Sequence, residues 1–87
     1  MNLRDSVIIV TGSATGLGAA VVKQVAAKGA RVVINYTKSE KEAHETEAVC
    51  DYLGVESILC KADVSVDEDC QRMAAEAIAK WGRIDGL

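Results

Sequence analysis

The sequence has few of the residues that usually fill a protein core. Its 87 residues contain no proline, no phenylalanine, one tryptophan, Trp81, and two tyrosines, Tyr36 and Tyr52. The apolar fraction of 49% is supplied largely by alanine and valine, whose side chains bury little area each. A chain of this length also buries a smaller share of its surface than a larger domain. These features favour part of a larger core over a complete one.

Membrane, secretory and nucleic-acid signals are absent as well. The longest uncharged stretch, residues 6–22, is interrupted by the turn-forming segment 11–16, which excludes a membrane span. Residues 1–5 do not form a charged-then-apolar leader, so we expect a cytoplasmic protein. A net charge of −3, from 10 basic and 13 acidic residues, offers no basic face. We therefore expect neither a nucleic-acid nor a membrane partner.

Metal-ligand pairs are missing too. The three cysteines, Cys50, Cys60 and Cys70, are ten residues apart, and the single histidine, His44, stands beside none of them. Zinc sites usually need ligand pairs two to four residues apart, so we predict no metal site. The cysteines are interpreted as small, buried or half-buried free thiols, which fits a reducing compartment.

What the chain does have is a regular alternation of short apolar runs and helical segments. Continuous β-branched runs are typical of strands that are covered on both faces of a parallel sheet. The apolar runs begin at Val7, Val32, Ile58 and Ile84. They therefore repeat every 25 or 26 residues, which is the length of a strand plus one crossover helix. The predicted strands are Val7–Val10, Arg31–Ile34, Ser57–Cys60 and the beginning of a fourth, Ile84–Leu87.

The three intervening segments have helix signals. Each is followed by a glycine suited to the left-handed conformation after a helix: Gly29, Gly54 and Gly82. The first is predicted over residues 16–28; the second and third are predicted to begin with capping boxes, Ser39 with Glu42 and Ser65 with Glu68. Each segment has a stripe of residues that we expect to face the core. In order along the chain, the stripes are Leu17, Val21 and Val25; Ala43, Thr46, Cys50 and Leu53; and Val66, Cys70, Met73, Ala77 and Trp81.

This alternation predicts an α/β fold with a doubly wound parallel sheet. Right-handed crossovers place the first three strands in the order 3-2-1, and the fourth returns to the other side of the first. The sheet is expected to be incomplete, with three strand–helix units and the start of strand 4. We interpret residues 1–87 as one partial domain, without a linker or second domain.

The segment 11–18 carries the clearest chemical signal. It joins the first strand to the first helix and contains Gly12, Gly16 and Gly18. Gly12 permits a tight turn, Gly16 lets the backbone approach a phosphate, and Gly18 lets the helix pack closely on the sheet. The helix N-terminus would stabilise a pyrophosphate. No Gly-Lys-Ser or Gly-Lys-Thr follows, so this is not a Walker A loop; the alternative is a glycine-rich turn without a ligand.

At these residues the chain resembles a known family. Thr11-Gly12-x-x-x-Gly16-x-Gly18, Asp63-Val64 and the segment 81–87 are similar to motifs of the classical short-chain dehydrogenases/reductases, particularly glucose-dehydrogenase-like and 3-oxoacyl-reductase-like members. The resemblance implies a Rossmann-type fold and a dinucleotide cofactor, with the Asp63 carboxylate accepting from the adenine amino group. The implied cofactor-binding residues are Gly12, Ser13, Thr15, Gly16, Leu17, Gly18, Asn35, Tyr36, Thr37, Lys38, Asp63 and Val64.

The family's catalytic groups have no counterpart in the 87 residues. The Asn-Asn-Ala-Gly motif would begin about two residues beyond Leu87, and the catalytic serine and Tyr-x-x-x-Lys pair would lie further on. Tyr36 and Tyr52 are each followed four residues later by glutamate, not lysine. His44 is interpreted as a surface residue. We predict no catalytic residue here and no activity for the isolated chain.

The cofactor's 2′ position is expected beside residues 34–39. Dinucleotide folds that prefer NAD place an acidic residue at the end of the second strand, and this segment has none. Thr37 and Lys38 can supply a hydroxyl and a positive charge to a 2′-phosphate. Thr15 stands where many NADP-preferring relatives have a basic residue. NADP is favoured over NAD, and dual use stays open.

Three functional hypotheses remain. The first is the cofactor-binding part of a truncated short-chain oxidoreductase that transfers hydride between a nicotinamide cofactor and a carbonyl or alcohol. The second is a non-catalytic dinucleotide-binding module. The third is a fragment that associates through its exposed sheet edge, as a homo-oligomer or with a complementary chain. A small-molecule substrate is expected only for a full-length enzyme.

Overall fold

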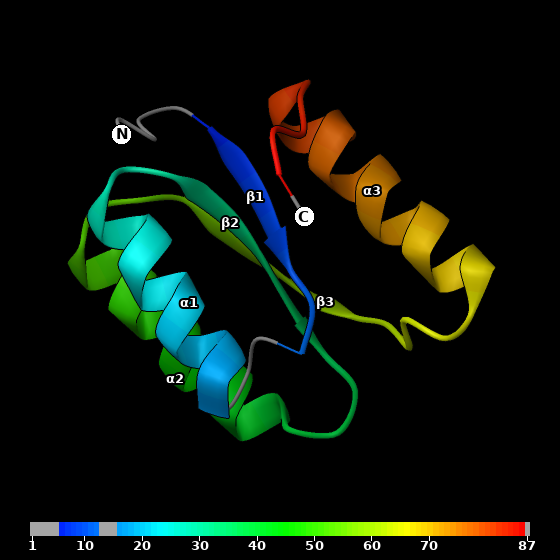
Figure 1. Ribbon diagram of the computed structural model, residues 1–87, viewed down its shortest axis with the longest axis horizontal. Helices are drawn as coiled ribbons and strands as arrows, with labels where there is room; N and C mark the ends of the chain where they lie inside the picture. Colours follow the sequence, from blue (N-terminus) through cyan, green and yellow to red (C-terminus); the bar gives the residue numbers. More distant parts are fainter. Residues whose placement is uncertain (1–5, 13–15, 87) are drawn as a thin grey trace.

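The computed structural model describes residues 6–12 and 16–86. Strands and helices alternate strictly along the chain (Figure 1). The elements are β1 (Val7–Val10), α1 (Gly16–Ala27), β2 (Arg31–Tyr36), α2 (Glu40–Tyr52), β3 (Ser57–Lys61) and α3 (Asp67–Trp81). This is the predicted alternation, and the strand and helix bounds differ from the expected ones by only a few residues.

The strands form a parallel sheet in which β2 is central. β1 pairs with β2 from Val7 opposite Arg31, and β2 pairs with β3 from Val32 opposite Ser57. The middle of β2 is continuously buried, because helices cover both of its faces. The predicted α/β class and the strand order 3-2-1 are confirmed.

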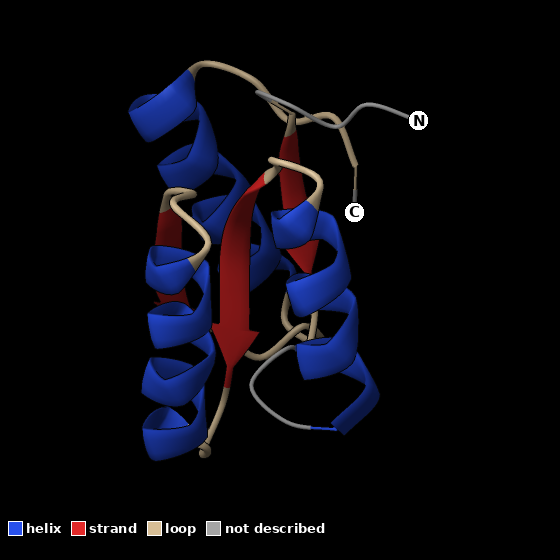
Figure 2. Cartoon of the chain, turned by 90° about the vertical axis from the view of Figure 1, so that its left-hand side faces the viewer, coloured by secondary structure: helices blue, strands red, loops and turns tan. Residues whose placement is uncertain are grey.

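Each face of the sheet has its own apolar core. Figure 1 shows α1 and α2 on one face and α3 on the other, and Figure 2 looks onto the face with two helices side by side. The core below α1 and α2 contains Val22, Ala26, Val32, Ile34, Ala43 and Cys50. The core below α3 contains Val7, Ile9, Val33, Cys60, Ala62, Met73 and Ala77.

The predicted buried stripe of α1 is wrong by one position. Val22 and Ala26 are buried, whereas Leu17 is 83% exposed. The reason is that apolar residues occupy nearly every side of this helix, so periodicity alone does not select a face. Val22 and the small Ala26 lie on the side that meets the sheet, and Val25 is only partly buried beside them.

The stripes of the other helices are confirmed at their centres and differ at their ends. Ala43, Thr46 and Cys50 are buried in α2, and Met73 and Ala77 are buried in α3. Leu53 and Val66 are 39% and 41% exposed because both lie at helix caps, where the chain turns away from the sheet. Cys70 and Trp81 are half-buried.

The glycine stops are confirmed, but the capping boxes are not formed. Gly29, Gly54 and Gly82 have φ of 91°, 76° and 75°. Ser39 is the residue before α2, yet its side chain makes no capping hydrogen bond. Val66, not Ser65, precedes α3; the Ser65 hydroxyl instead donates to Asp63 Oδ1 at 2.7 Å, which delays the start of the helix.

After α3 the chain returns to the free side of β1. The Ile9 N–H donates to the Gly86 carbonyl at 3.0 Å, and Ile8 and Gly86 form a parallel bridge. A Cβ added to Gly86 would lie 2.9 Å from Ile8 Cδ1, so a larger residue here would require the Ile8 side chain to shift. The predicted return of the fourth strand to the other side of β1 is therefore confirmed at its first bridge.

Asp85 fastens this returning segment. Its Oδ2 accepts from the Val7 N–H at 2.8 Å, and the Arg83 guanidinium donates to both carboxylate oxygens at 2.6 and 2.8 Å. Arg83 and the Val7 N–H hold the pKa of the Asp85 carboxyl below its usual value of 3.8. The ionised side chain therefore helps to align residues 83–86 with β1.

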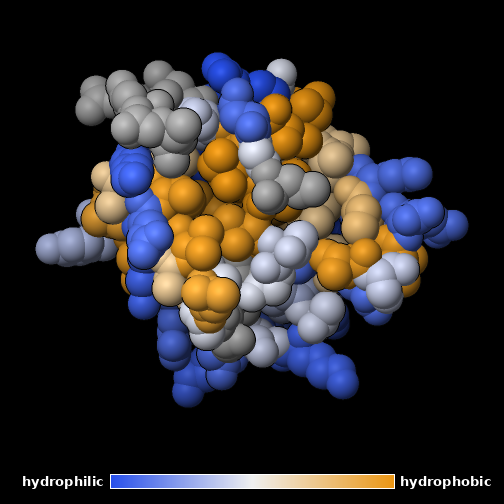
Figure 3. Space-filling model, in the orientation of Figure 1, coloured by the Kyte–Doolittle hydropathy of each residue, from blue (hydrophilic) through white to orange (hydrophobic). Residues whose placement is uncertain are grey.

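The face that carries β1 is apolar. Figure 3 shows hydrophobic residues gathered in the middle of this face, where β1 lies in Figure 1. Ile8 and Val10 are only half-buried, and Ile84 is 36% exposed. Within residues 6–12 and 16–86, no helix is long and apolar enough to cross a membrane.

We expect Asp85→Asn to lower the thermal unfolding midpoint at neutral pH, because the amide loses the charged pairing with Arg83. The stabilising contribution of a carboxyl with a lowered pKa is present above its usual pKa and is lost as pH falls below that value. The variant should therefore lose less stability than the parent between pH 5 and about pH 2. Thermal scans across this range test it, with Asp51→Asn on the exposed end of α2 as control. Parallel pH profiles for the parent and D85N would contradict the prediction.

Candidate functional site

The predicted site residues come together at one edge of the sheet. Parallel strands share the edge at which they end, and ligands of open α/β sheets bind outside it. β1 leads to Gly12 and α1, β2 leads to Thr37 and Lys38, and β3 leads to Asp63 and Val64. Ser13 and Thr15 lie outside the described residues. The edge thus gathers three chain segments that are more than twenty residues apart in sequence.

Asn35 links these three segments from inside the sheet. Its side chain is 2% exposed. Oδ1 accepts from the Gly12 N–H at 2.9 Å, while Nδ2 donates to the Ala62 carbonyl at 2.9 Å and to the Cys60 carbonyl at 3.4 Å. One amide therefore joins the end of β2 to the chain leaving β1 and to the end of β3.

The resemblance also implied a cofactor-binding role for Asn35, and that role stays a prediction. The hydrogen bonds described above join its side chain to the backbone of Gly12, Cys60 and Ala62. We interpret it as a residue that positions the glycine turn. The sequence signal was a single amide within an otherwise apolar strand, since a buried polar group needs partners.

The glycine turn has open space above it. Gly12 and Gly16 have φ of 59° and 60°, a region that side chains with a Cβ adopt poorly. A Cβ placed on either glycine would meet no atom of the described residues within 4 Å. The glycines are therefore required by backbone conformation and not by packing against the described part of the chain. Gly18 is half-buried in the first turn of α1, and Leu17 is exposed beside the turn.

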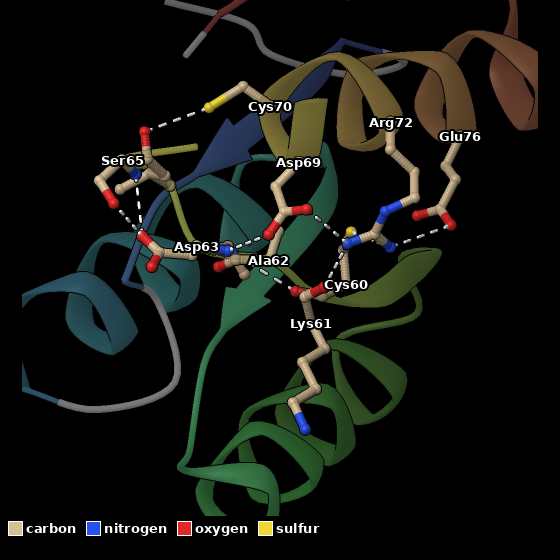
Figure 4. Close-up of polar contacts among 11 residues, drawn as sticks. Cys60, Lys61, Ala62, Asp63, Ser65, Asp69, Cys70, Arg72 and Glu76 are labelled. Carbon is tan, nitrogen blue, oxygen red and sulfur yellow. Dashed lines mark hydrogen bonds and ion pairs between the residues drawn. The ribbon is translucent and has the colours of Figure 1, made fainter. Parts of the chain in front are cut away.

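The loop after β3 is organised around Asp63 (Figure 4). Asp63 Oδ1 accepts from both the N–H and the hydroxyl of Ser65, at 2.9 and 2.7 Å. These hydrogen bonds from Ser65 lower the pKa of the Asp63 carboxyl, which stays ionised at neutral pH. Val64 is 48% exposed, and its carbonyl accepts from the Cys70 thiol at 3.3 Å.

Two residues that the sequence reasoning missed hold this loop against α3. Asp69 accepts from the Asp63 N–H at 2.8 Å, and Arg72 donates to the Lys61 carbonyl at 2.6 Å. Arg72 also pairs with Asp69 at 3.7 Å and with Glu76 at 3.9 Å. The signal was the spacing of three and four residues between opposite charges on one helix.

A cavity of about 450 Å³ lies at the ends of β2 and β3, within the range of small-molecule sites. It is lined by Thr37, Lys38, Lys61, Asp63 and Asp69. A second hollow of about 550 Å³ lies between α1 and α2 and includes Gly16, Lys23 and Glu42. The first is the better candidate because it lies at the carboxyl edge and contains predicted site residues.

The cysteines and the histidine are placed as predicted. Cys50 and Cys60 are buried and Cys70 is half-buried, all as free thiols. Burial, with Glu76 beside it, raises the pKa of Cys60 to about 11, so this thiol stays protonated at neutral pH. The His44 side chain is 59% exposed and lies near two glutamates of α2. Over the described ranges, no three potential metal ligands form a cluster.

We expect Asn35→Ala to reduce the free energy of unfolding by roughly 1–3 kcal/mol, because the carbonyl of the buried Ala62 loses its partner, whereas water can replace the partner of the Gly12 N–H. Urea unfolding measures the change. Thr46→Val is the matched control: it removes another buried side chain's hydrogen bond, but one to the Glu42 carbonyl on the same helix. We expect the control to cost under about 1 kcal/mol. Equal losses of unfolding free energy in the two variants would show that the hydrogen bonds of Asn35 between strands stabilise the fold no more than one within a helix.

Comparison with known proteins agrees with this geometry. The family model of the short chain dehydrogenases matches residues 6–87. A short-chain dehydrogenase/reductase homolog, YusS of Bacillus subtilis, is 36% identical over 100% of this chain and 80% of its own length. A short-chain dehydrogenase/reductase of Pestalotiopsis microspora, GME11373, is 37% identical over 95% of this chain but only 31% of its own.

Solved structures of the same kind superpose closely. A short-chain dehydrogenase from Burkholderia cenocepacia, in complex with NADP, has a TM-score of 0.92 at 32% identity, over 98% of this chain and 35% of that one. A hydroxysteroid dehydrogenase from Escherichia coli has a TM-score of 0.91 at 27% identity, over 99% and 36%. The chain thus spans about a third of these structures and most of YusS. By the family match and the shared fold, it belongs to the short-chain dehydrogenases/reductases.

Proposed function

We propose that this chain is the NAD(P)-binding N-terminal segment of a short-chain oxidoreductase. In the full-length enzyme, hydride would pass between the nicotinamide and a carbonyl or alcohol substrate. The observation that carries the proposal is the open glycine turn, which Asn35 holds at the carboxyl edge. A Cβ on Gly12 or Gly16 would meet no described atom within 4 Å, and, unlike the glycines that end helices, these two lie between β1 and α1 at the carboxyl edge of the sheet.

The pyrophosphate would bind over the glycine turn. Gly12 and Gly16 leave room for it, and the start of α1 offers backbone N–H groups and the positive end of a helix dipole. There is no acidic residue in the first turn of α1, so nothing there would repel an anion. The exposed Leu17 would cover the bound dinucleotide.

The adenine would bind in the loop after β3. Asp63 uses Oδ1 for Ser65, which leaves Oδ2 available to accept from the adenine amino group. The exposed Val64 would contact the ring. The adenosine ribose would then lie near the end of β2, beside Tyr36, Thr37 and Lys38. Support comes from the NADP complex of the Burkholderia cenocepacia relative, which shares the fold.

A second candidate function is a short protein that binds a dinucleotide without turnover. One observation favours it: the chain accounts for 80% of YusS, a relative with little more sequence of its own. The cytoplasmic location stays a prediction. Association with a second copy or with a complementary chain also stays a prediction, and it is supported by the apolar face that carries β1.

We expect Gly16→Val to weaken binding of NAD and NADP at least tenfold, about 1.4 kcal/mol, because a branched side chain would occupy the pyrophosphate position. Gly54→Val is the matched control. Gly54 has a φ of 76° and no atom within 4 Å of an added Cβ, so it suffers comparable backbone strain at the other edge of the sheet. Calorimetric titration compares the variants. Equal affinities of the parent and G16V would show that the turn is not the site.

We also expect no dehydrogenase activity from the 87-residue chain. Tyr36 and Tyr52 lack the lysine that would support a proton donor, and Tyr52 is 89% exposed at the end of α2. The assay incubates the chain with NADPH and a panel of ketones and follows the nicotinamide absorbance. Turnover that survives repurification and is abolished by Tyr36→Phe would contradict this expectation and identify the donor.

A further inference from the structure

The cavity at the ends of β2 and β3 contains a lysine that no cofactor motif includes. Lys61 is the last residue of β3 and pairs in register with Tyr36, the last residue of β2. Paired residues of neighbouring strands project from the same face of a sheet. Lys61 therefore stands beside the position at which NAD-preferring folds carry their acidic residue.

The backbone of Lys61 is fixed while its side chain is exposed. Arg72 donates to the Lys61 carbonyl at 2.6 Å, so the end of β3 is fastened to α3. Figure 4 shows the Lys61 side chain pointing away from the cluster formed by Asp69, Arg72 and Glu76. Lys61 and Lys38 both line the cavity of about 450 Å³.

Both carboxylates of the cavity already accept hydrogen bonds from protein groups, whereas its two amines have no partner among the described residues. Asp63 accepts from Ser65, and Asp69 accepts from the Asp63 N–H and pairs with Arg72. In the described part of the chain, neither the Lys38 amine nor the Lys61 amine makes a hydrogen bond or ion pair. The cavity thus presents two unpaired amines and the Thr37 hydroxyl, beside the carboxylates of Asp63 and Asp69.

We propose that Lys61 is a specificity-determining residue that, together with Lys38, binds the 2′-phosphate of NADP. The inference rests on the proposed dinucleotide function and adds a residue from β3 to it. A lysine recognises phosphate as a mobile point charge, and two such charges suit a dianionic group. The 2′-hydroxyl of NAD carries no charge, so Lys61 contributes selectively to the phosphorylated cofactor.

The test compares two fragments of the cofactors, adenosine 2′,5′-bisphosphate and adenosine 5′-monophosphate, together with NADP and NAD. Each is titrated by calorimetry into the 87-residue chain and into Lys61→Gln, Lys61→Arg and Lys38→Gln. Lys28→Gln is the control, because Lys28 is an exposed lysine just after α1, at the opposite edge of the sheet. Thermal unfolding verifies that all variants are equally folded.

We expect Lys61→Gln to weaken binding of the 2′-phosphorylated ligands about tenfold and binding of the others less than twofold. Lys61→Arg should keep most of the preference, and Lys28→Gln all of it. Equal changes for both ligand classes, or none, would overturn the role of Lys61 while leaving dinucleotide binding intact. Binding of neither NAD nor NADP by the parent would instead overturn the proposed function, and this inference with it.

Discussion

The arrangement of the candidate site depends on one buried amide. Asn35 lies in the central strand, and its hydrogen bonds reach the Gly12 N–H on one side and the Ala62 carbonyl on the other. Without it, the buried Ala62 would lose the hydrogen-bond partner of its carbonyl, which proteins rarely tolerate. Asn35 joins the three strand ends from within the sheet, and no described atom lies within 4 Å of a Cβ on Gly12 or Gly16. The contacts that hold the turn therefore lie on its buried side, and the proposed ligand would bind on its exposed side.

A second layer of polar contacts determines which charges the site presents. The chain is acidic, with a net charge of −3, yet the two carboxylates that line the cavity, Asp63 and Asp69, already accept hydrogen bonds from protein groups. Asp69 satisfies the Asp63 N–H and the Arg72 guanidinium, and as a first-turn residue it also suits the helix dipole. The side chains of Lys38 and Lys61 are left without a hydrogen-bond or ion-pair partner among the described residues. Local pairing of the carboxylates therefore leaves these two amines available to an anion.

Strong local signals explain what the sequence could predict. The regular spacing of the apolar runs predicted the order of strands and helices, which agrees with the structure. The glycines after each helix and in the turn after β1 have the positive φ that favours this residue type. The buried face of α1 could not be read in the same way, because its valines and alanines surround the helix. The Ser65 hydroxyl donates to Asp63 instead of capping α3, because a serine side chain can bond to more than one nearby partner and the sequence does not select between them. Lys61 could not be predicted as a site residue, because its proposed role depends on its pairing with Tyr36, which sequence spacing does not reveal.

The return of the chain to β1 shows why the glycine turn follows that strand. β2 lies on one side of β1 and residues 84–86 lie on the other, so the strand order reverses at β1. In doubly wound sheets the loops diverge at such a reversal and leave a crevice at the carboxyl edge. Asp85 fixes the returning segment to the Val7 N–H at the amino end of β1, far from that crevice. The same strand is therefore held at its amino end by Asp85 and leads at its carboxyl end into the glycine turn, where we propose that the pyrophosphate binds.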